Sequence, residues 1–107
     1  MRRATLGLPI AVVALASVAL AADAGLPTAK DCIQSWPEAR MQAYGYNHIV
    51  HVKDVCAVGA DCVITTDVNP EPTKLSVGPK SEAEINTWLG SPARVFVPTV
   101  VCTMRAR

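Results

Sequence analysis

The stretch that decides the fold runs from Tyr46 to Val68 and reads YNHIVHVKDVCAVGADCVITTDV. Its first part, Tyr46 to Val55, is rich in Tyr, Ile and Val, and its last part, Cys62 to Val68, contains two β-branched pairs. Such runs predict two strands. Between Cys56 and Cys62 lies a short connection that contains a glycine, and this favours a hairpin closed by the two cysteines.

The cysteines define a second feature of the chain, and there are four of them: Cys32, Cys56, Cys62 and Cys102. An even number in a small exported domain predicts a disulfide framework, because the compartment is oxidising and the core is thin. Three pairings are open, of which we favour Cys56 with Cys62 and Cys32 with Cys102. Structural zinc is the alternative, but its ligands usually come in pairs roughly two to four residues apart. The spacings here are 24, 6 and 40.

Strand signals continue downstream of the opening stretch, at Leu75 to Val77 and from Arg94 to Met104. The second run is interrupted by Pro98, which indicates an edge strand or a bulge. Ser81 to Leu89 combines a capping-box pattern with the alternation of a strand, and we favour the strand. Trp36 to Tyr44 is predicted to be a short helix, because a capping box opens it and a glycine follows it.

These elements predict an all-β, mainly β fold: a small disulfide-stapled β-sandwich or open barrel with one short N-terminal helix. The first 21 residues are set apart from it, because Arg2 and Arg3 precede a long uncharged stretch that ends in a small-x-small triplet at 19–21. This is the organisation of a secretory signal peptide. We therefore expect a signal peptide over residues 1–21 and a single β-rich domain over 22–107. The domain is expected to be periplasmic or extracellular, without stable membrane insertion after cleavage.

Three further segments, together with the cysteine spacing, carry a resemblance. They are Tyr46 to His51, Thr66 to Pro72 and Gly90 to Phe96. In these the chain resembles a group of small exported, four-cysteine bacterial proteins. The resemblance covers most of the mature chain and implies a single β-rich domain, but it implies no activity, substrate or site.

The mature domain is close to neutral. Cleavage removes Arg2 and Arg3, which leaves eight Lys and Arg against nine Asp and Glu and a net charge of −1. Nucleic-acid binding draws most of its affinity from the neutralisation of phosphates by clustered basic side chains. We therefore expect no nucleic-acid partner. The expected partner is an unknown protein or a component of the cell envelope.

Two histidines and three acidic residues are the candidates for chemistry. His48, His51 and Asp54 form H-x-x-H-x-x-D, which on a helix would gather three metal ligands. On a strand, residues three apart point to opposite faces, so we assign no metal and no cofactor. Glu82 and Glu84 would share a strand face as a carboxylate pair, but a domain of this size leaves little room for a substrate cleft.

No catalytic residue is assigned, and we predict that the chain is not an enzyme. The mature serines occupy cap or turn contexts outside any G-x-S-x-G elbow: Ser35, Ser76, Ser81 and Ser91. A cysteine nucleophile would need a free thiol. We interpret Trp36 and Trp88 as packing residues rather than a binding platform, and Arg94 as a solvated turn residue.

The segment Asn69-Pro70-Glu71-Pro72 is predicted to be a stiff, exposed loop, because its two prolines cannot donate ladder hydrogen bonds. The leading functional hypothesis is a non-catalytic exported binding or envelope-associated module that presents such loops to a partner. A secreted protease inhibitor that presents this loop is the alternative. A small hydrolase comes third.

Overall fold

The computed structural model describes residues 26–106, so the predicted signal peptide over residues 1–21 lies outside the described residues. Within the described range the chain forms one four-residue helix and six strands. The elements are α2 (Ala29–Cys32), β1 (Ile33–Gln42), β2 (Gly45–Asp54), β3 (Ala60–Thr66), β4 (Thr73–Val77), β5 (Glu82–Ser91) and β6 (Pro98–Met104). The prediction of a small, mainly β, disulfide-stapled fold is confirmed.

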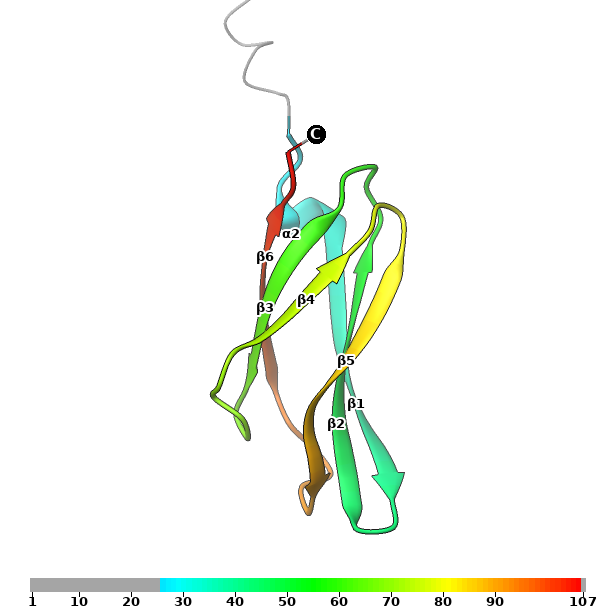
Figure 1. Ribbon diagram of the computed structural model, residues 1–107, viewed down its shortest axis with the longest axis vertical. Helices are drawn as coiled ribbons and strands as arrows, with labels where there is room; N and C mark the ends of the chain where they lie inside the picture. Colours follow the sequence, from blue (N-terminus) through cyan, green and yellow to red (C-terminus); the bar gives the residue numbers. More distant parts are fainter. Residues whose placement is uncertain (1–25, 107) are drawn as a thin grey trace, which may run out of the picture.

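The strands form two antiparallel three-stranded sheets, ordered β1-β2-β5 and β4-β3-β6. The two sheets face each other as the layers of a sandwich (Figure 1). The chain crosses between the sheets after β2, after β4 and after β5. Each sheet therefore contains strands that are distant in sequence, and neither can form from a single local hairpin.

The core lies between the two sheets. Val50 and Val52 of β2 belong to one buried cluster with Ile64 of β3, Val77 of β4 and Phe96. In β3 buried and more exposed residues alternate along the strand, because successive side chains point to opposite faces. Full burial of each such side chain contributes about 1.5–3 kcal/mol. The core is small, so covalent crosslinks have a large share in the stability of the fold.

The predicted helix over Trp36 to Tyr44 is wrong, because this segment belongs to β1 and to the turn that follows it. The β1 strand pairs with β2 along its whole length, from Ile33 opposite Asp54 to Gln42 opposite Gly45. The pairing contacts along this ladder stabilise the strand more than the local capping pattern stabilises a helix. The glycine predicted to stop the helix instead closes the β1–β2 hairpin: Gly45 has a φ of 134°, and a Cβ there would lie 2.6 Å from the Ser91 carbonyl oxygen.

The predicted hairpin between Cys56 and Cys62 is also wrong, and so is the disulfide pairing built on it. The flanking strands β2 and β3 belong to different sheets, so residues 55–59 are a crossover. The disulfides join Cys32 to Cys56 and Cys62 to Cys102. The physical reason is strand pairing, since Cys62 lies directly opposite Cys102 in the β3–β6 ladder, with the two Cα atoms 4.0 Å apart.

The other strand predictions are confirmed for Leu75 to Val77 and for Ser81 to Leu89, whereas the run predicted from Arg94 to Met104 is a strand only from Pro98 onward. Ser81 to Leu89 lies almost entirely in β5, and Leu75 to Val77 lies in β4. Pro98 is the first residue of β6, which is an edge strand of its sheet.

No helix among residues 26–106 is long and apolar enough to cross a membrane.

Removal of either disulfide should destabilise the domain strongly. The crosslinks close loops with sequence separations of 24 and 40 residues. Chain-entropy estimates for such loops are about 3.5 and about 4 kcal/mol, a large part of the stability of a small domain. We therefore expect the double variants Cys32→Ala/Cys56→Ala and Cys62→Ala/Cys102→Ala each to lower the free energy of unfolding in urea by about 3 to 4 kcal/mol. A double variant that unfolds at the wild-type midpoint would contradict this.

Candidate functional site

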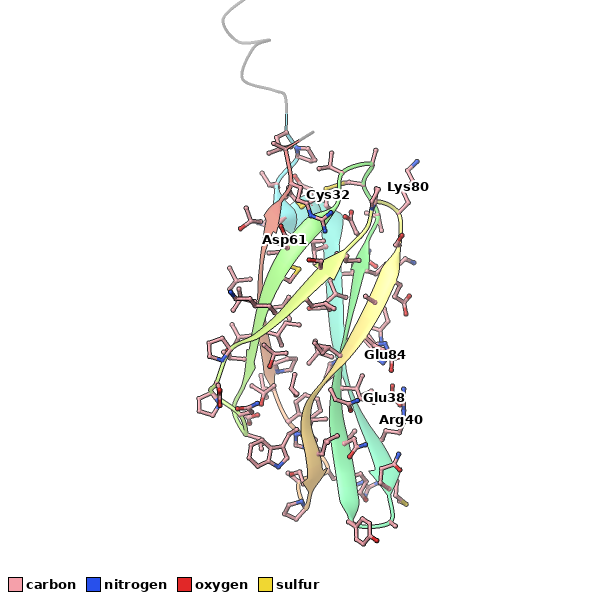
Figure 2. The ribbon with its side chains drawn as sticks, in the orientation of Figure 1. Cys32, Glu38, Arg40, Asp61, Lys80 and Glu84 are labelled. Atoms are coloured by element: carbon pink, nitrogen blue, oxygen red, sulfur yellow. A yellow bond between two sulfur atoms is a disulfide. The ribbon has the colours of Figure 1, made fainter. Side chains whose placement is uncertain are left out.

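The outer face of the β1-β2-β5 sheet carries a group of charged and aromatic side chains, which we call the outer-face cluster. Its members are Trp36, Glu38 and Arg40 from β1, His51 from β2, and Glu82 and Glu84 from β5. Strand alternation puts the β1 residues on one face, and the register sets Trp36 opposite His51 and His51 opposite Glu84. Figure 2 shows Glu38, Arg40 and Glu84 gathered on this side of the molecule.

His51 occupies the centre of the cluster. Its Nε2 lies 2.7 Å from Glu38 Oε1, and because a carboxylate only accepts, Nε2–H is the donor. Its Nδ1 is buried without a hydrogen-bond partner and faces two carboxylates, Glu84 Oε1 at 3.8 Å and Glu82 Oε2 at 3.9 Å. The Trp36 ring stacks on the imidazole, with centroids 5.2 Å apart and planes 6° apart. The imidazole is therefore held between an aromatic ring and three acidic side chains.

Glu38 receives two hydrogen bonds from one guanidinium. Arg40 donates from Nη2 to Oε1 at 2.8 Å and from Nε to Oε2 at 2.9 Å. These bonds, followed by the bond from His51, lower the pKa of Glu38 from 4.5 to about 2. Arg40 also lies 3.4 Å from Glu84 Oε2. The pairs are exposed and contribute little to stability, but they fix the positions of the polar groups around Trp36.

The predicted separation of His48 and His51 is confirmed, because His48 lies on the opposite side of β2. It is fully buried, donates from Nε2 to the Ala93 carbonyl oxygen at 2.8 Å, and stacks on Phe96 with the ring centroids 4.1 Å apart. The H-x-x-H-x-x-D pattern therefore does not bring its two histidines together. His48 supports the packing of the segment that precedes β6.

Asp54, the third member of that pattern, is buried beside the Cys32–Cys56 disulfide. Its Oδ1 accepts the Cys56 N–H at 2.9 Å, whereas its Oδ2 has no hydrogen-bond partner. Ligand atoms of Asp54, Cys32 and Cys56 lie within 4.8 Å of one another. Both sulfurs are in the disulfide and cannot act as thiolate ligands, so this group does not form a metal site in the oxidised protein.

The two tryptophans are more exposed than the packing interpretation predicts, at 38% for Trp36 and 45% for Trp88. They do not form one platform. A bulge at Thr87 shifts the β2–β5 register, so that Trp88 lies opposite His48 while Trp36 lies opposite His51. Cross-strand partners share a face, and the two tryptophans therefore lie on different sides of the sheet.

The prediction that the serines occupy cap or turn contexts holds for Ser81 but is wrong for the other three, which lie on strands because strand pairing outweighs the local turn signals: Ser35, Ser76 and Ser91. Ser76 Oγ donates to Asp61 and Ser81 Oγ to the Pro79 carbonyl oxygen, while the buried Ser91 Oγ accepts from the Ala93 N–H. The exposed Ser35 lies on β1. Within residues 26–106 no serine hydrogen bonds to a histidine.

Arg94 is exposed beside a shallow depression that Phe96 also lines.

The loop from Asn69 to Pro72 connects β3 to β4, and it is exposed at Pro70, Glu71 and Pro72. Asn69 anchors it: its Nδ2 donates to the Thr87 carbonyl oxygen at 2.7 Å, and its backbone N–H donates to Thr66 Oγ1 at 2.8 Å. The Thr66 N–H donates back to the Asn69 carbonyl oxygen at 2.9 Å. The loop is therefore held at one end by a fixed polar network.

Sequence reasoning found His51, Glu82 and Glu84 individually but missed the cluster that they form. Glu38 and Arg40 were hidden because their segment was predicted to be helical. The alternation Trp36-x-Glu38-x-Arg40 was the available signal, since every second residue of a strand shares a face.

Comparison of the chain with protein-family models, curated proteins and solved structures finds no match. The geometry of the outer face and of the β3–β4 loop is therefore the basis for inferring a function.

The low pKa of Glu38 can be measured directly. We expect its carboxyl carbon to titrate by NMR with a midpoint near pH 2, and the midpoint to move up toward 4.5 in Arg40→Gln, because the largest cause of the shift is removed. Because the folded-state pKa is depressed, the stability from this pair is present above about pH 4.5 and is lost as the pH falls toward 2. Arg94→Gln is the matched control and should leave the midpoint unchanged. An unchanged midpoint in Arg40→Gln would contradict the assignment.

Proposed function

We propose that this chain is an exported, non-catalytic binding module of the cell envelope, and that its partner docks on the outer-face cluster. The signal-peptide pattern of residues 1–21 supports export. The two intramolecular disulfides indicate an oxidising compartment, as is found in the periplasm and outside the cell. Once the leader is removed, the domain acts as a soluble module on this account.

The observation that carries the proposal is the position of Trp36. One face of its ring covers the His51 imidazole, and the side chain remains exposed beside Glu38 and Arg40, which are locked to each other. An aromatic ring with rigid polar neighbours offers apolar contact and directed hydrogen bonds together. Because these side chains are already ordered, a partner would lose little conformational entropy on binding them.

A hydroxyl-rich glycan is the ligand class that fits this chemistry. A sugar ring has apolar C–H faces that can lie on Trp36, and its hydroxyl groups can donate to the carboxylates of Glu38 and Glu84 and accept from Arg40. The cluster has three carboxylates and one guanidinium, so its acidic balance disfavours an anionic partner and suits the hydroxyl groups of a neutral sugar, which can donate to carboxylates. Envelope polysaccharides present such rings in repeated arrays.

Binding is favoured over catalysis because the acidic residues surround His51 on an open sheet face. His51, Glu82 and Glu84 do converge, but the four depressions described on residues 26–106 are lined by other residues. Acid–base catalysis depends on a site that holds the substrate and excludes water. The third hypothesis, a small hydrolase, gains no support from this arrangement.

A secreted protease inhibitor is the second candidate, and the Asn69 network is the observation that favours it. A loop anchored in this way presents Pro70 to Pro72 in one conformation, as a substrate-like inhibitor needs. A panel of serine, cysteine and metalloproteases separates the two functions. Inhibition at micromolar concentration that is lost in Asn69→Ala would favour the inhibitor, and we expect the mature domain to inhibit none of them.

The glycan proposal is tested by cosedimentation of the mature, oxidised domain with insoluble cell-wall glycan. Trp36→Ala should weaken binding about tenfold, because it removes the exposed aromatic surface of the cluster. Trp88→Ala removes a tryptophan that is exposed to a similar degree on the other side of the sheet, and it should bind as the wild type does. Circular dichroism checks that both variants are folded. Equal losses in the two variants, or no sedimentation of the wild type, would contradict the proposal.

A further inference from the structure

A buried carboxylate lies beside the disulfide that Cys32, at one end of the sandwich, forms with Cys56 (Figure 2). This carboxylate belongs to Asp54, whose side chain is only 1% exposed. Its Oδ1 accepts the Cys56 N–H, whereas its Oδ2 is buried and has no hydrogen-bond donor among residues 26–106. A buried carboxylate oxygen is costly to leave without a donor or a cation. The turn at Asp54 therefore explains one oxygen of the side chain and leaves the other without a role.

The two sulfurs and this carboxylate are close enough to bind one ion. One ligand atom each from Cys32, Asp54 and Cys56 lies within 4.8 Å of the other two, and residues 26–106 contain no second group of this kind. Asp54 and Cys56 belong to one short segment, and Cys32 is the last residue of α2. Zn²⁺ binds thiolate and carboxylate ligands, and three protein ligands leave a fourth position for water. The donor set therefore fits zinc once the sulfurs are free thiolates.

Hydrogen bonds hold both cysteines in place independently of the disulfide. The Cys32 carbonyl oxygen accepts the Val55 N–H at 2.9 Å, and the Cys56 carbonyl oxygen accepts the Lys80 N–H at 3.0 Å. The Cys56 N–H is held in turn by Asp54 Oδ1. Cleavage of the S–S bond breaks none of these contacts, so the reduced chain keeps the three side chains together.

The position of Cys56 gives access to the pair. Cys56 is half-buried on the crossover over residues 55–59, whereas Cys32 is fully buried in α2. A reductant or a metal ion therefore approaches from the side of Cys56, and the irregular crossover can move to let the sulfurs separate. The other disulfide differs in both respects. Cys62 and Cys102 are held opposite each other in a strand ladder, and no third ligand from the described residues joins them.

We propose that Cys32, Cys56 and Asp54 form a redox-gated zinc site, in which the oxidised chain holds the disulfide and the reduced chain binds Zn²⁺. A dithiol reductant supplies the two electrons. Its first thiolate attacks Cys56 Sγ and displaces the Cys32 thiolate. Its second thiolate then attacks the reductant's own sulfur in the mixed disulfide and releases Cys56, so that the reductant becomes a cyclic disulfide. Each cysteine takes up one proton as a thiol and loses it again when Zn²⁺ binds.

The two states of this site give the domain a crosslink in either redox condition. The ion joins the same residues as the disulfide, so it closes the same loop, and it gives the Asp54 oxygen a partner. Reoxidation by a disulfide oxidant removes the two electrons, re-forms the Cys32–Cys56 bond and releases the ion. On the export proposed above, the new chain arrives with reduced cysteines, so Zn²⁺ can bind before the disulfide forms.

Anaerobic titration of the fully reduced mature domain with Co²⁺, a spectroscopic substitute for Zn²⁺, tests the proposal. We expect one equivalent of Co²⁺ to give a thiolate-to-metal charge-transfer band, and Zn²⁺ to abolish the band by displacing Co²⁺. Zn²⁺ should also raise the melting temperature of the reduced domain. It should leave the melting temperature of the oxidised domain unchanged, because that form has no thiolates to bind it.

Two cysteine variants locate the site. Cys62→Ala/Cys102→Ala keeps all three proposed ligands, so its reduced form should give the same charge-transfer band as the wild type. Cys32→Ala/Cys56→Ala removes both thiolates of the site and should give no band, although it retains the other two thiols.

Asp54→Asn tests the carboxylate separately from its structural role. The amide keeps an oxygen that accepts the Cys56 N–H, but it is a neutral and weaker zinc ligand. We expect it to weaken Zn²⁺ binding at least about tenfold while the oxidised domain keeps its fold by circular dichroism. Asp31→Asn is the matched control, because it removes an exposed carboxylate next to Cys32 in α2, and its Zn²⁺ affinity should equal that of the wild type.

Three results overturn the proposal: no charge-transfer band in the reduced domain, a band that persists in Cys32→Ala/Cys56→Ala, or equal Zn²⁺ affinities in Asp54→Asn and the wild type. A reduced domain that unfolds without metal is decided by the same titration. Zn²⁺ should then restore the β-sheet signal in circular dichroism, and a chain that stays unfolded with Zn²⁺ has no such site.

Discussion

The Cys62–Cys102 crosslink is the constraint on which the rest of the structure depends. It joins two neighbouring strands, β3 and β6, at residues that strand pairing sets directly opposite each other, and it locks that register covalently. Because side chains alternate along a strand, that register turns Ile64 and Met104 into the core. Between the two cysteines the chain forms β4 and then β5, which belongs to the other sheet, before it returns as β6.

The two sheets share one core but present different outer surfaces. On β1-β2-β5 the outward residues form a hydrogen-bonded polar network around His51, whereas on β4-β3-β6 the outward residues of β6 are one valine and two threonines, and Asp61 lies beside them on β3. Polar networks of this kind hold side chains in fixed positions and suit recognition.

Local composition predicted which segments are strands, because β-branched residues and alternation are properties of short stretches. The β2, β3 and β5 strands follow from their residues in this way. Pairing could not be predicted, since it depends on which distant segment lies alongside: β1 has a helix-like start at Ser35, yet ten residues of β2 make it a strand. The disulfide pairing could not be predicted for the same reason. Closeness in sequence favoured Cys56 with Cys62, but the chain crosses from one sheet to the other between these two cysteines. The outer-face cluster was missed as a consequence of the β1 error.

Peptide mapping of the mature protein under non-reducing conditions is the most direct test of this account. Digestion should release one peptide pair that joins Cys32 to Cys56 and another that joins Cys62 to Cys102, both of which disappear on reduction. A pair that joins Cys56 to Cys62, or Cys32 to Cys102, would contradict the β3–β6 register. The core and the outer face would then have to be assigned anew.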